Sequence, residues 1–385
     1  MNFQGYPRQN GTVGIRNHVL VFPTVICSSE VARMISQAVP GTVYVAHPHG
    51  CGHLGVEKEH IIRTMGGFCS NPNIAAVLLV GNGCELISTE VLAEELKKNR
   101  QRFEIVNVQD EGGTTGAVEK GKSLAEHLKY EAQEAKRISC GISELIIGVK
   151  CGGSDTLSGL TANPAVGYTA DLVVSHGGTV LISEVPEMLG AEHVLARRAR
   201  NRDTADRILQ ITSTMEKKIL ETGVDIRGTE PSPGNIEGGL STLEEKSLGA
   251  ILKGGSTPVQ QVVQYAERPS EKGLVIMDGP ALDAVVNTGM VAAGAQIIVF
   301  TTGRGTPLGS PVAPVIKVSS NTQLYQKMKD NIDINAGGIV DGSGNLVSVG
   351  EKIFHEILEV ASGKLTRSEI LGHSEFAIHN IGPAV

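Results

Sequence analysis

The sequence predicts an α/β protein with parallel sheets, built from Rossmann-like βαβ units in two domains. Three observations lead to this prediction. Short apolar, β-branched runs alternate with helical patterns along the chain, as in successive βαβ units. Several runs are unbroken rather than alternating, which is typical of strands covered on both faces in a parallel sheet. The chain has 385 residues, more than a single hydrophobic core usually holds.

The individual elements follow from the positions of these runs. The apolar, β-branched segments predicted to be strands are residues 18–25, 42–46, 75–80, 103–108, 145–149, 179–182, 274–277, 296–300 and 315–318. The segments with a helical pattern are residues 29–39, 89–99, 116–135, 281–293 and 352–361. In the last of these, Ile353, Ile357 and Val360 form one apolar stripe, as expected of an amphipathic helix.

A charged stretch at residues 130–137 separates the first four predicted strands from the later ones. We therefore predict domains of residues 1–137 and 138–385. The segment 227–255 has few strand signals and many Gly, Pro and Ser residues. It is predicted to be a long ordered excursion, and long loops in compact domains are commonly functional.

Composition excludes several classes of protein. The net charge is −7, aromatic residues make up 3% and Trp is absent, so we expect no nucleic-acid partner. No apolar run approaches the ~20 residues of a membrane span, so we expect no membrane association. The N-terminal residues lack the pattern of a secretory signal. The six Cys lack small-domain disulfide spacing, which predicts a cytoplasmic location.

Residues 116–123 match the P-loop pattern letter for letter. That pattern requires its first glycine directly after a buried strand. Here the preceding strand ends near Val108, and Ala117, Val118 and Leu124 continue one helical stripe. We therefore predict a helix at this position and no nucleotide site.

Three predicted strands end in polar, glycine-containing or carboxylate-rich turns, at residues 46–53, 183–187 and 301–306. In parallel α/β sheets such turns lie at the carboxyl edge, where ligands bind. The first turn contains His47, His49, Cys51 and His53, and a Gly-Cys-Glu turn with Cys84 and Glu85 follows the next strand. His and Cys suit a borderline transition metal, and Glu suits a harder ion or a base. The alternative is a glycine-rich turn whose histidines cap strand ends.

The turn after the strand at 145–149 reads Lys150-Cys151-Gly152-Gly153-Ser154-Asp155. A Gly-Gly pair after a strand offers backbone N–H groups that can hold a carboxylate or phosphate. Ser154 could instead be an ordinary helix N-cap, with Asp155 a partner of the helix dipole.

Glu184, Glu187, Glu192 and His193 follow the strand at 179–182. Paired carboxylates are costly to bury without a cation, so a metal or a shared proton is their natural companion. Pro186 indicates that Glu184 precedes the helix. The alternative is a solvated, acidic helix start.

These motifs occur in order over nearly the whole chain, together with Gly14–Asn17, Asn163-Pro164, Pro231–Asn235, Glu245–Ser247, Phe300–Gly305 and Asp333–Asn335. Taken together they resemble the altronate and galactarate dehydratase (UxaA) family. The chain departs from many members of that family at Ala336 and Ser310, where those members have Cys. These departures weaken any transfer of substrate choice.

The resemblance implies a metal-dependent hydro-lyase that eliminates water from a sugar acid such as altronate or galactarate to give a 2-keto-3-deoxy acid. It implies a divalent metal, Fe²⁺ or Mn²⁺. It also implies a small SAF-type N-terminal domain, which we expect on a separate subunit, and we expect the chain to form a homo-oligomer. Two alternatives stay open: the large subunit of a sulfolactate sulfo-lyase, and a non-catalytic subunit that binds sugar acids.

Residue roles follow from the motifs and the resemblance together. The expected metal ligands are His47, Cys51, Cys84, Glu85, Cys151 and Glu184. The expected catalytic residues are Glu187, His193 and Asp155. The expected substrate-binding residues are Arg16, Asn17, Ser154, Lys150 and Arg304. A less favoured alternative is an iron–sulfur cluster on Cys51, Cys84 and Cys151, with one iron left open.

Overall fold

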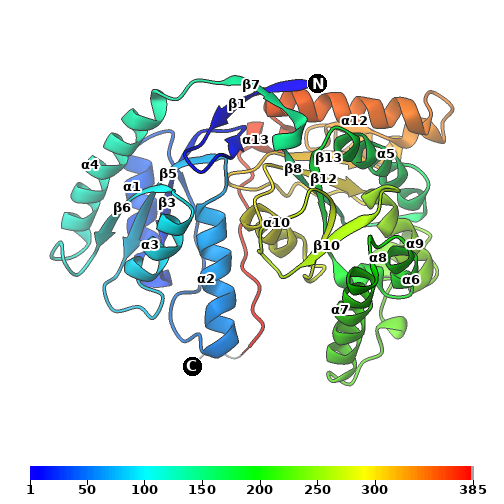
Figure 1. Ribbon diagram of the computed structural model, residues 1–385, viewed down its shortest axis with the longest axis horizontal. Coiled ribbons are helices and arrows are strands. Elements are labelled where there is room, and N and C mark those ends of the chain that lie inside the picture. The colour runs from blue at the N-terminus through cyan, green and yellow to red at the C-terminus, as the bar shows by residue number, and fades with distance from the viewer. Residues whose placement is uncertain (383–385) are drawn as a thin grey trace.

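The computed structural model describes residues 1–382 and contains three sheets (Figure 1). The largest sheet is entirely parallel, with the strand order β10 (Val259–Val263), β11 (Gly273–Met277), β9 (Thr179–Ile182), β8 (Ile146–Cys151), β12 (Ile297–Thr302), β13 (Val315–Ser319) and β14 (Ile334–Asn335). A second parallel sheet has the order β4 (Val43–Tyr44), β3 (His18–Pro23), β5 (Ile74–Gly81) and β6 (Arg102–Asn107). The α/β class with parallel sheets is therefore confirmed.

A small antiparallel sheet joins the start of the chain to its middle. It consists of β2 (Val13–Gly14), β1 (Asn2–Pro7) and β7 (Ile138–Gly141). The predicted boundary near residue 137 falls just before β7. The two domain ranges stay a prediction, because β1 pairs with a strand from beyond that boundary.

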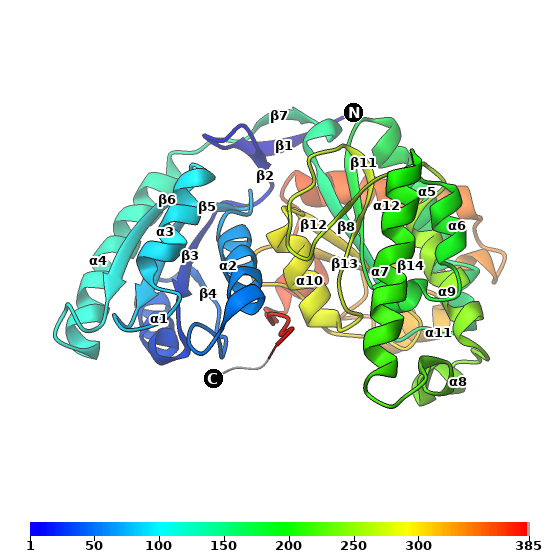
Figure 2. The same ribbon diagram turned by 60° about the horizontal axis from the view of Figure 1, so that its bottom comes forward.

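Helices cover both faces of the two parallel sheets (Figures 1 and 2). Those following the strands of the four-stranded sheet are α1 (Ser29–Ala38), α2 (Gly55–Cys69), α3 (Thr89–Lys98) and α4 (Thr114–Gln133). Those of the seven-stranded sheet and its excursions are α5 (Ala162–Ser175), α6 (Glu192–Arg197), α7 (Arg202–Leu220), α8 (Pro233–Glu237), α9 (Leu243–Ile251), α10 (Asp283–Ala292), α11 (Thr322–Lys327), α12 (Leu346–Ala361) and α13 (Arg367–Ile370). We call the four-stranded sheet with α1–α4 the small lobe, and the seven-stranded sheet with its helices the large lobe.

Most predicted elements are confirmed. Gly116 and Gly121 lie inside α4, so the P-loop pattern is indeed helical. The segment 227–255 is ordered but is largely helical, because it contains α8, α9 and the short turn η6 (Leu252–Gly254). The sequence patterns did not reveal α2, α5 and α7.

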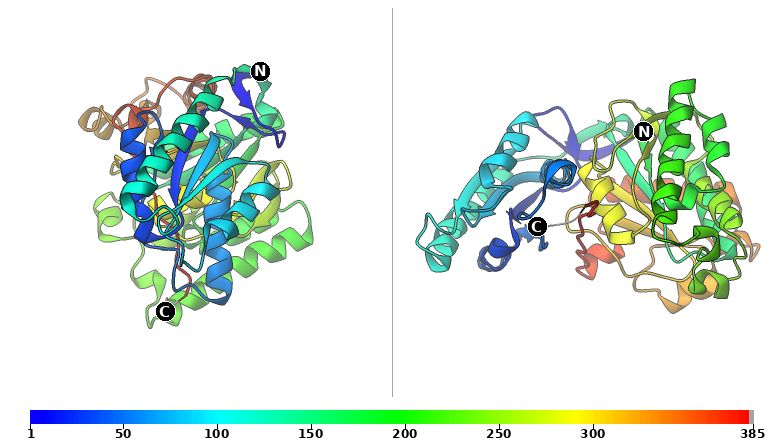
Figure 3. Two further views of the ribbon diagram at one scale, coloured as in Figure 1. Left: turned by 90° about the vertical axis from the view of Figure 1, so that its left-hand side faces the viewer. Right: turned by 90° about the horizontal axis from the view of Figure 1, so that it is seen from below.

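The two lobes meet along α2 and α10, which pack side by side (Figure 3). At their ends, Asn71 Nδ2 donates to the carbonyls of Val291 (2.7 Å) and Ala295 (2.9 Å). Near their starts, His60 stacks on Tyr265, whose hydroxyl donates to the carbonyl of Val285. The two helices therefore run in the same direction. Since each begins beyond the carboxyl ends of its own sheet, both carboxyl edges lie at the same end of the molecule.

The last described residues run along this junction (Figure 1). Phe376 packs against Phe22 and Phe68 of the small lobe. The amide of Ala377 donates to Thr288 Oγ1 of α10 at 3.1 Å. The junction is thus filled by side chains of both lobes and of the C-terminal segment.

Protonation of buried histidines should weaken the fold in acid. Burial lowers the pKa of His47, His49 and His60 from 6.5 to about 4. In the unfolded chain these imidazoles bind protons near pH 6.5, so between pH 6.5 and about 4 the unfolded state binds more protons than the folded state. Stability should therefore fall as the pH falls through this window.

The substitution His60→Phe keeps the ring that stacks on Tyr265 and removes one of these titrating groups. We expect the midpoint of thermal unfolding to depend less steeply on pH between 6.5 and 4 than in the parent chain. The control is His127→Phe, because His127 is exposed and should leave the slope unchanged. An identical slope in His60→Phe and the parent would contradict this account.

Candidate active site

The candidate site lies where the strand order of the seven-stranded sheet reverses. From β8 the chain continues to β9 on one side, whereas β12 pairs with β8 on the other side. The turns that follow β8 and β12 are joined directly, because the amides of Gly303 and Arg304 both donate to the carbonyl of Gly153, at 2.9 and 2.7 Å. In open α/β sheets ligands bind in the crevice at this point.

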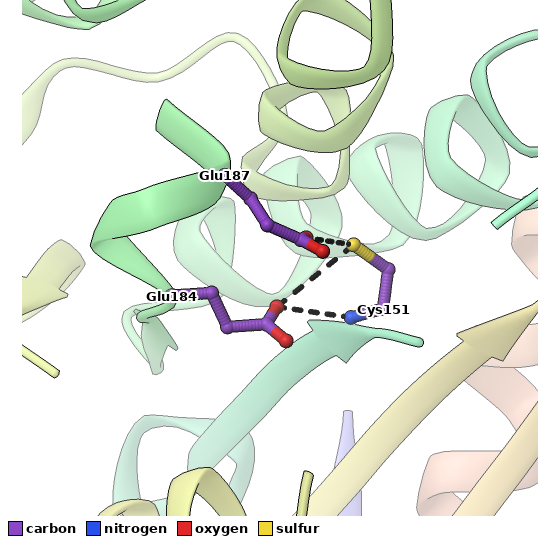
Figure 4. A group of neighbouring side chains, drawn as sticks. All are labelled: Cys151, Glu184 and Glu187. Atoms are coloured by element: carbon purple, nitrogen blue, oxygen red, sulfur yellow. Dashed lines mark hydrogen bonds between the residues drawn. The ribbon is translucent and has the colours of Figure 1, made fainter. Parts of the chain in front are cut away.

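A thiol and two carboxylates converge beside this crevice (Figure 4), and an ammonium group contacts them. The thiol of Cys151 donates to Glu187 Oε2 at 2.7 Å, and its backbone amide donates to Glu184 Oε2 at 3.1 Å. Lys253 Nζ lies 3.2 Å from both Cys151 Sγ and Glu184 Oε2. Glu184 is fully buried, and Cys151 and Lys253 are nearly so. We call Cys151, Glu184, Glu187, Lys150 and Lys253 the acidic cluster with its two lysines.

Lys150 balances the negative charge of Glu184 at its other carboxylate oxygen. Its ammonium group lies 3.3 Å from Glu184 Oε1, forms an ion pair with Asp283 at the start of α10, and lies 4.2 Å from the centre of the Phe300 ring. A third lysine, Lys246, lies 3.5 Å from Glu187 Oε1. Glu184 therefore lies between two ammonium groups, and Glu187 is contacted by a lysine from α9.

The pKa shifts follow from this packing. Burial raises the pKa of the Cys151 thiol well above its ordinary value, and the negative charge of Glu187 adds to the rise. Burial alone would lower the pKa of Lys150 and Lys253, but the charges around them reverse this and raise both pKa values. At neutral pH the thiol is therefore protonated and both lysines are charged.

The backbone at Glu184 is strained. Its φ is 74° and its ψ is 58°, the left-handed region that non-glycine residues rarely occupy. Glu184 precedes the short helix η4 (Val185–Met188), as Pro186 predicted. Such strain persists only where the surroundings hold it, and it concentrates at functional sites.

The turn after Gly153 is held by Asp155. Its carboxylate accepts hydrogen bonds from Ser158, from Ser320 Oγ (2.8 Å) and from Asn321 Nδ2 (3.0 Å). Asp155 thus caps the short helix η3 (Thr156–Gly159) and joins three loops. These contacts hold the turn in place, and a catalytic role for Asp155 stays a prediction.

Two cavities open on either side of Asp155. One, of about 290 Å³, is lined by Ser154 and by Lys246, the lysine that contacts the acidic cluster. The other, of about 620 Å³, is lined by Arg304. Arg304 is half-exposed and pairs with Glu237 at 2.9 Å.

Three other predicted site residues have surroundings different from those of this cluster: Arg16, Asn17 and His193. Arg16 is buried and pairs with Glu369, and it also donates to the carbonyls of Val360 and Lys364. Asn17 bonds to Arg8 and to the end of α4. His193 is exposed at the start of α6. Their predicted roles find no support in these contacts.

The six predicted metal ligands fall into two groups. Cys151 and Glu184 lie in the large lobe. The others follow strands of the small lobe, where His47 is buried and Cys51 and Cys84 are exposed. Glu85 accepts hydrogen bonds from Thr24 and from the amides of residues 82–84, so it stabilises its own turn. Within residues 1–382, the set of three His, Cys or carboxylate groups whose ligand atoms all lie within 4.8 Å is Cys151, Glu184 and Glu187.

Sequence reasoning missed several charged members of the site, namely Lys246, Lys253 and Asp283. Lys246 and Lys253 lie in the glycine-rich segment predicted to be functional, and Lys246 lies in a motif of the family resemblance. Nothing in the local sequence shows that their ammonium groups are buried, because their partners Cys151, Glu184 and Glu187 lie 59 to 102 positions earlier in the chain.

A buried set of acids, a thiol and lysines at the switch point of a doubly wound sheet is the arrangement of an enzyme active site. Residues 142–384 match the family described as D-galactarate/altronate dehydratase, C-terminal. Residues 5–133 match the one described as D-galactarate dehydratase/altronate hydrolase, second domain. The chain therefore belongs to the galactarate and altronate dehydratase family, as its motifs indicated, and it is an enzyme of the lyase class.

Three relatives show the range of this similarity. Altronate dehydratase of Bacillus subtilis (strain 168) is 37% identical over 99% of this chain and 78% of its own length. Galactarate dehydratase (L-threo-forming) of Escherichia coli (strain K12) is 38% identical over 99% of the chain and 77% of its own length. The (2R)-sulfolactate sulfo-lyase subunit beta of Chromohalobacter salexigens is 35% identical over 98% of the chain and 96% of its own length.

No helix within residues 1–382 is long and apolar enough to cross a membrane.

The substitution Glu184→Gln tests the electrostatics of the site. It removes the charge that lies between Lys150 and Lys253, so two buried ammonium groups lose a partner. We expect the free energy of unfolding to fall by about 3–5 kcal/mol. Adding Lys253→Met removes one unpaired charge and should restore part of the loss. Denaturant unfolding of the parent, the single variant and the double variant measures both effects.

The matched control is Glu237→Gln, which removes a carboxylate from an exposed ion pair with Arg304. It should leave stability unchanged, since exposed pairs contribute little. A Glu184→Gln chain as stable as the parent would show that the buried charges do not depend on one another.

Proposed function

We propose that the chain eliminates water from a polyhydroxy carboxylate, a sugar acid such as altronate or galactarate, to give a 2-keto-3-deoxy acid. The observation that carries this proposal is the acidic cluster with its two lysines at the switch point. Eliminating water requires a base for the α-proton, an acid for the leaving hydroxyl, and positive charge near the anion that develops. The cluster supplies all three kinds of group within one site.

The donor set also fits a divalent metal, which we propose to be Fe²⁺ or Mn²⁺. Cys151, Glu184 and Glu187 offer one sulfur and two oxygen atoms within 4.8 Å of one another. Glu184 Oε1 accepts no hydrogen bond and lies 3.3 Å from the ammonium group of Lys150, so a metal ion would share this oxygen with that lysine. A metal bound there would polarise substrate oxygens. Cys151 would have to lose its proton to bind it, as thiol ligands do.

The side chains of the cluster differ in their exposure to solvent, and we assign their roles in the reaction on that basis. Glu187 is the carboxylate of the cluster that is not completely buried, so we assign it the proton transfer. Lys150 and Lys253 stay charged and would stabilise negative charge on the substrate. Ser154 and Lys246 line the adjoining cavity, where they would bind the substrate's hydroxyl and carboxylate groups.

A second reaction, elimination of sulfite from sulfolactate, is supported by the 35% identity to a sulfo-lyase subunit over nearly the whole chain. Both reactions need a base and a stabilised carbanion, so the cluster suits either. The name of that relative, a subunit beta, also supports our proposal of a separate small subunit as partner. A substrate panel of aldonates, aldarates and sulfolactate, assayed with and without the partner, separates the reactions. Tight binding of sugar acids without turnover under any metal would instead show a binding subunit.

Glu187→Gln tests the assignment of the proton transfer. Because Gln cannot exchange a proton at neutral pH, we expect kcat to fall about 10²–10⁴-fold, with the fold preserved by circular dichroism. The assay is the formation of 2-keto acid from the substrate that the parent chain accepts.

Glu230→Gln is the matched control, because Glu230 also pairs with Lys246 but lies outside the three-donor set. It should retain most of the parent activity. Equal losses in the two variants would show that Lys246 pairing, and not proton transfer by Glu187, limits turnover.

Lys253→Met tests the metal proposal without using activity. Lys253 contacts all three donor residues, at 3.2 Å (Cys151 and Glu184) and 3.9 Å (Glu187). Loss of its positive charge leaves more of the negative charge of the two carboxylates unbalanced. Mn²⁺ should therefore bind more tightly and raise the midpoint of thermal unfolding more than in the parent. Among the three donors Lys246 contacts Glu187 alone, so Lys246→Met should give a smaller increase in this midpoint. Equal responses to Mn²⁺ in the parent and both variants would contradict the proposal.

A further inference from the structure

Three exposed cysteines gather at the carboxyl edge of the small lobe. Cys27 lies in the short helix η1 (Ile26–Ser28) directly after β3, Cys51 follows β4, and Cys84 follows β5. The chain's other three cysteines are all buried. Cysteine is among the most buried residue types, so exposure of three thiols on adjacent strand ends requires an explanation.

The three loops that carry these thiols are bound to one another. The amide of Ile26 donates to the carbonyl of His49, and the amide of Ile87 donates to the carbonyl of Gly50, both at 3.0 Å. Any Cβ at Gly50 would lie 2.3 Å from the carbonyl oxygen of Thr24, so the second loop lies directly against the first. The sheet and these contacts therefore hold together the three loops that carry the thiols.

The surroundings suit a sulfur-bound group. Asn82 Nδ2 lies 3.2 Å from Cys84 Sγ and donates to it, and hydrogen bonds to sulfur tune iron–sulfur sites. Two exposed apolar side chains lie close to these cysteines in the chain: Ile26 directly precedes Cys27, and Leu86 follows Cys84 by two positions. An apolar shell around a metal site limits the access of solvent.

In the structure the ligand atoms of these thiols do not all lie within 4.8 Å of one another, so they are not gathered as closely as the ligands of a single ion. An iron–sulfur cluster binds each cysteine at a different iron. We propose that Cys27, Cys51 and Cys84 hold an iron–sulfur cluster with three protein ligands and one iron open to a further ligand. The three thiols bind as thiolates and release their protons.

Cys151 is not part of this set. It lies in the large lobe, where its thiol is buried and donates to Glu187. The alternative cluster on Cys51, Cys84 and Cys151 is therefore replaced by one in which Cys27 is the third ligand. The proposal does not depend on the reaction proposed above, since it concerns binding of iron and sulfide alone.

Anaerobic reconstitution of the full chain with equal amounts of ferrous and ferric iron and with sulfide tests the proposal. We expect a brown protein with broad visible absorption, and about four iron and four sulfide per chain for a cubane cluster. Iron bound without sulfide would overturn the proposal. So would a colourless chain after reconstitution, and if that chain turned over sugar acids with Mn²⁺, the dehydration proposal would stand.

Variants assign the ligands. Cys27→Ala, Cys51→Ala and Cys84→Ala should each lose most of the visible absorption, and because these side chains are exposed, the fold should survive. Cys140→Ala, which removes a buried thiol of β7, is the matched control and should keep the full absorption. A Cys27→Ala chain that still binds the cluster, or a Cys151→Ala chain that loses it, would overturn the ligand assignment.

Discussion

The structure of the candidate site depends on the burial of the Glu184 carboxylate between two lysines. A buried charge is tolerated only when it is paired and hydrogen-bonded, and Glu184 is contacted by Lys150, Lys253 and the amide of Cys151. These partners come from β8 and from the turn after α9. The carboxylate therefore joins the central strand of the sheet to the helical excursion that covers it, and the strained backbone at Glu184 is kept in place by the same contacts.

Much of the fold could be predicted from the sequence. Buried parallel strands need apolar, β-branched residues on both faces, so β3, β5, β8 and β12 are visible as unbroken runs. The turn containing Cys151 and the pair Glu184 and Glu187 could also be found, because polar residues directly after a buried strand lie at a sheet edge. The proximity of these two turns then follows from β8 and β9 being neighbours.

The remaining parts depend on contacts between distant segments. Lys253 follows α9 in a segment without strands, and only tertiary packing buries its ammonium group. Cys27 follows an apolar run directly and has no histidine or glycine around it to mark a site. Arg16 presents the converse case, because its motif suggested a carboxylate clamp for the substrate. Its partner is a carboxylate of the protein itself, Glu369, which lies more than 350 positions away in the chain.

The parallel arrangement of α2 and α10 has a consequence for how a ligand enters. Side chains of both helices belong to one continuous hydrophobic core that also includes residues of both sheets, such as Phe22 and Phe300. Opening such a junction would expose apolar surface at a high free-energy cost. The two lobes are thus expected to move as a single rigid body and not to open about a hinge. Selection among substrates would then fall to the loops at the shared end of the two lobes, and divergence between family members should concentrate there.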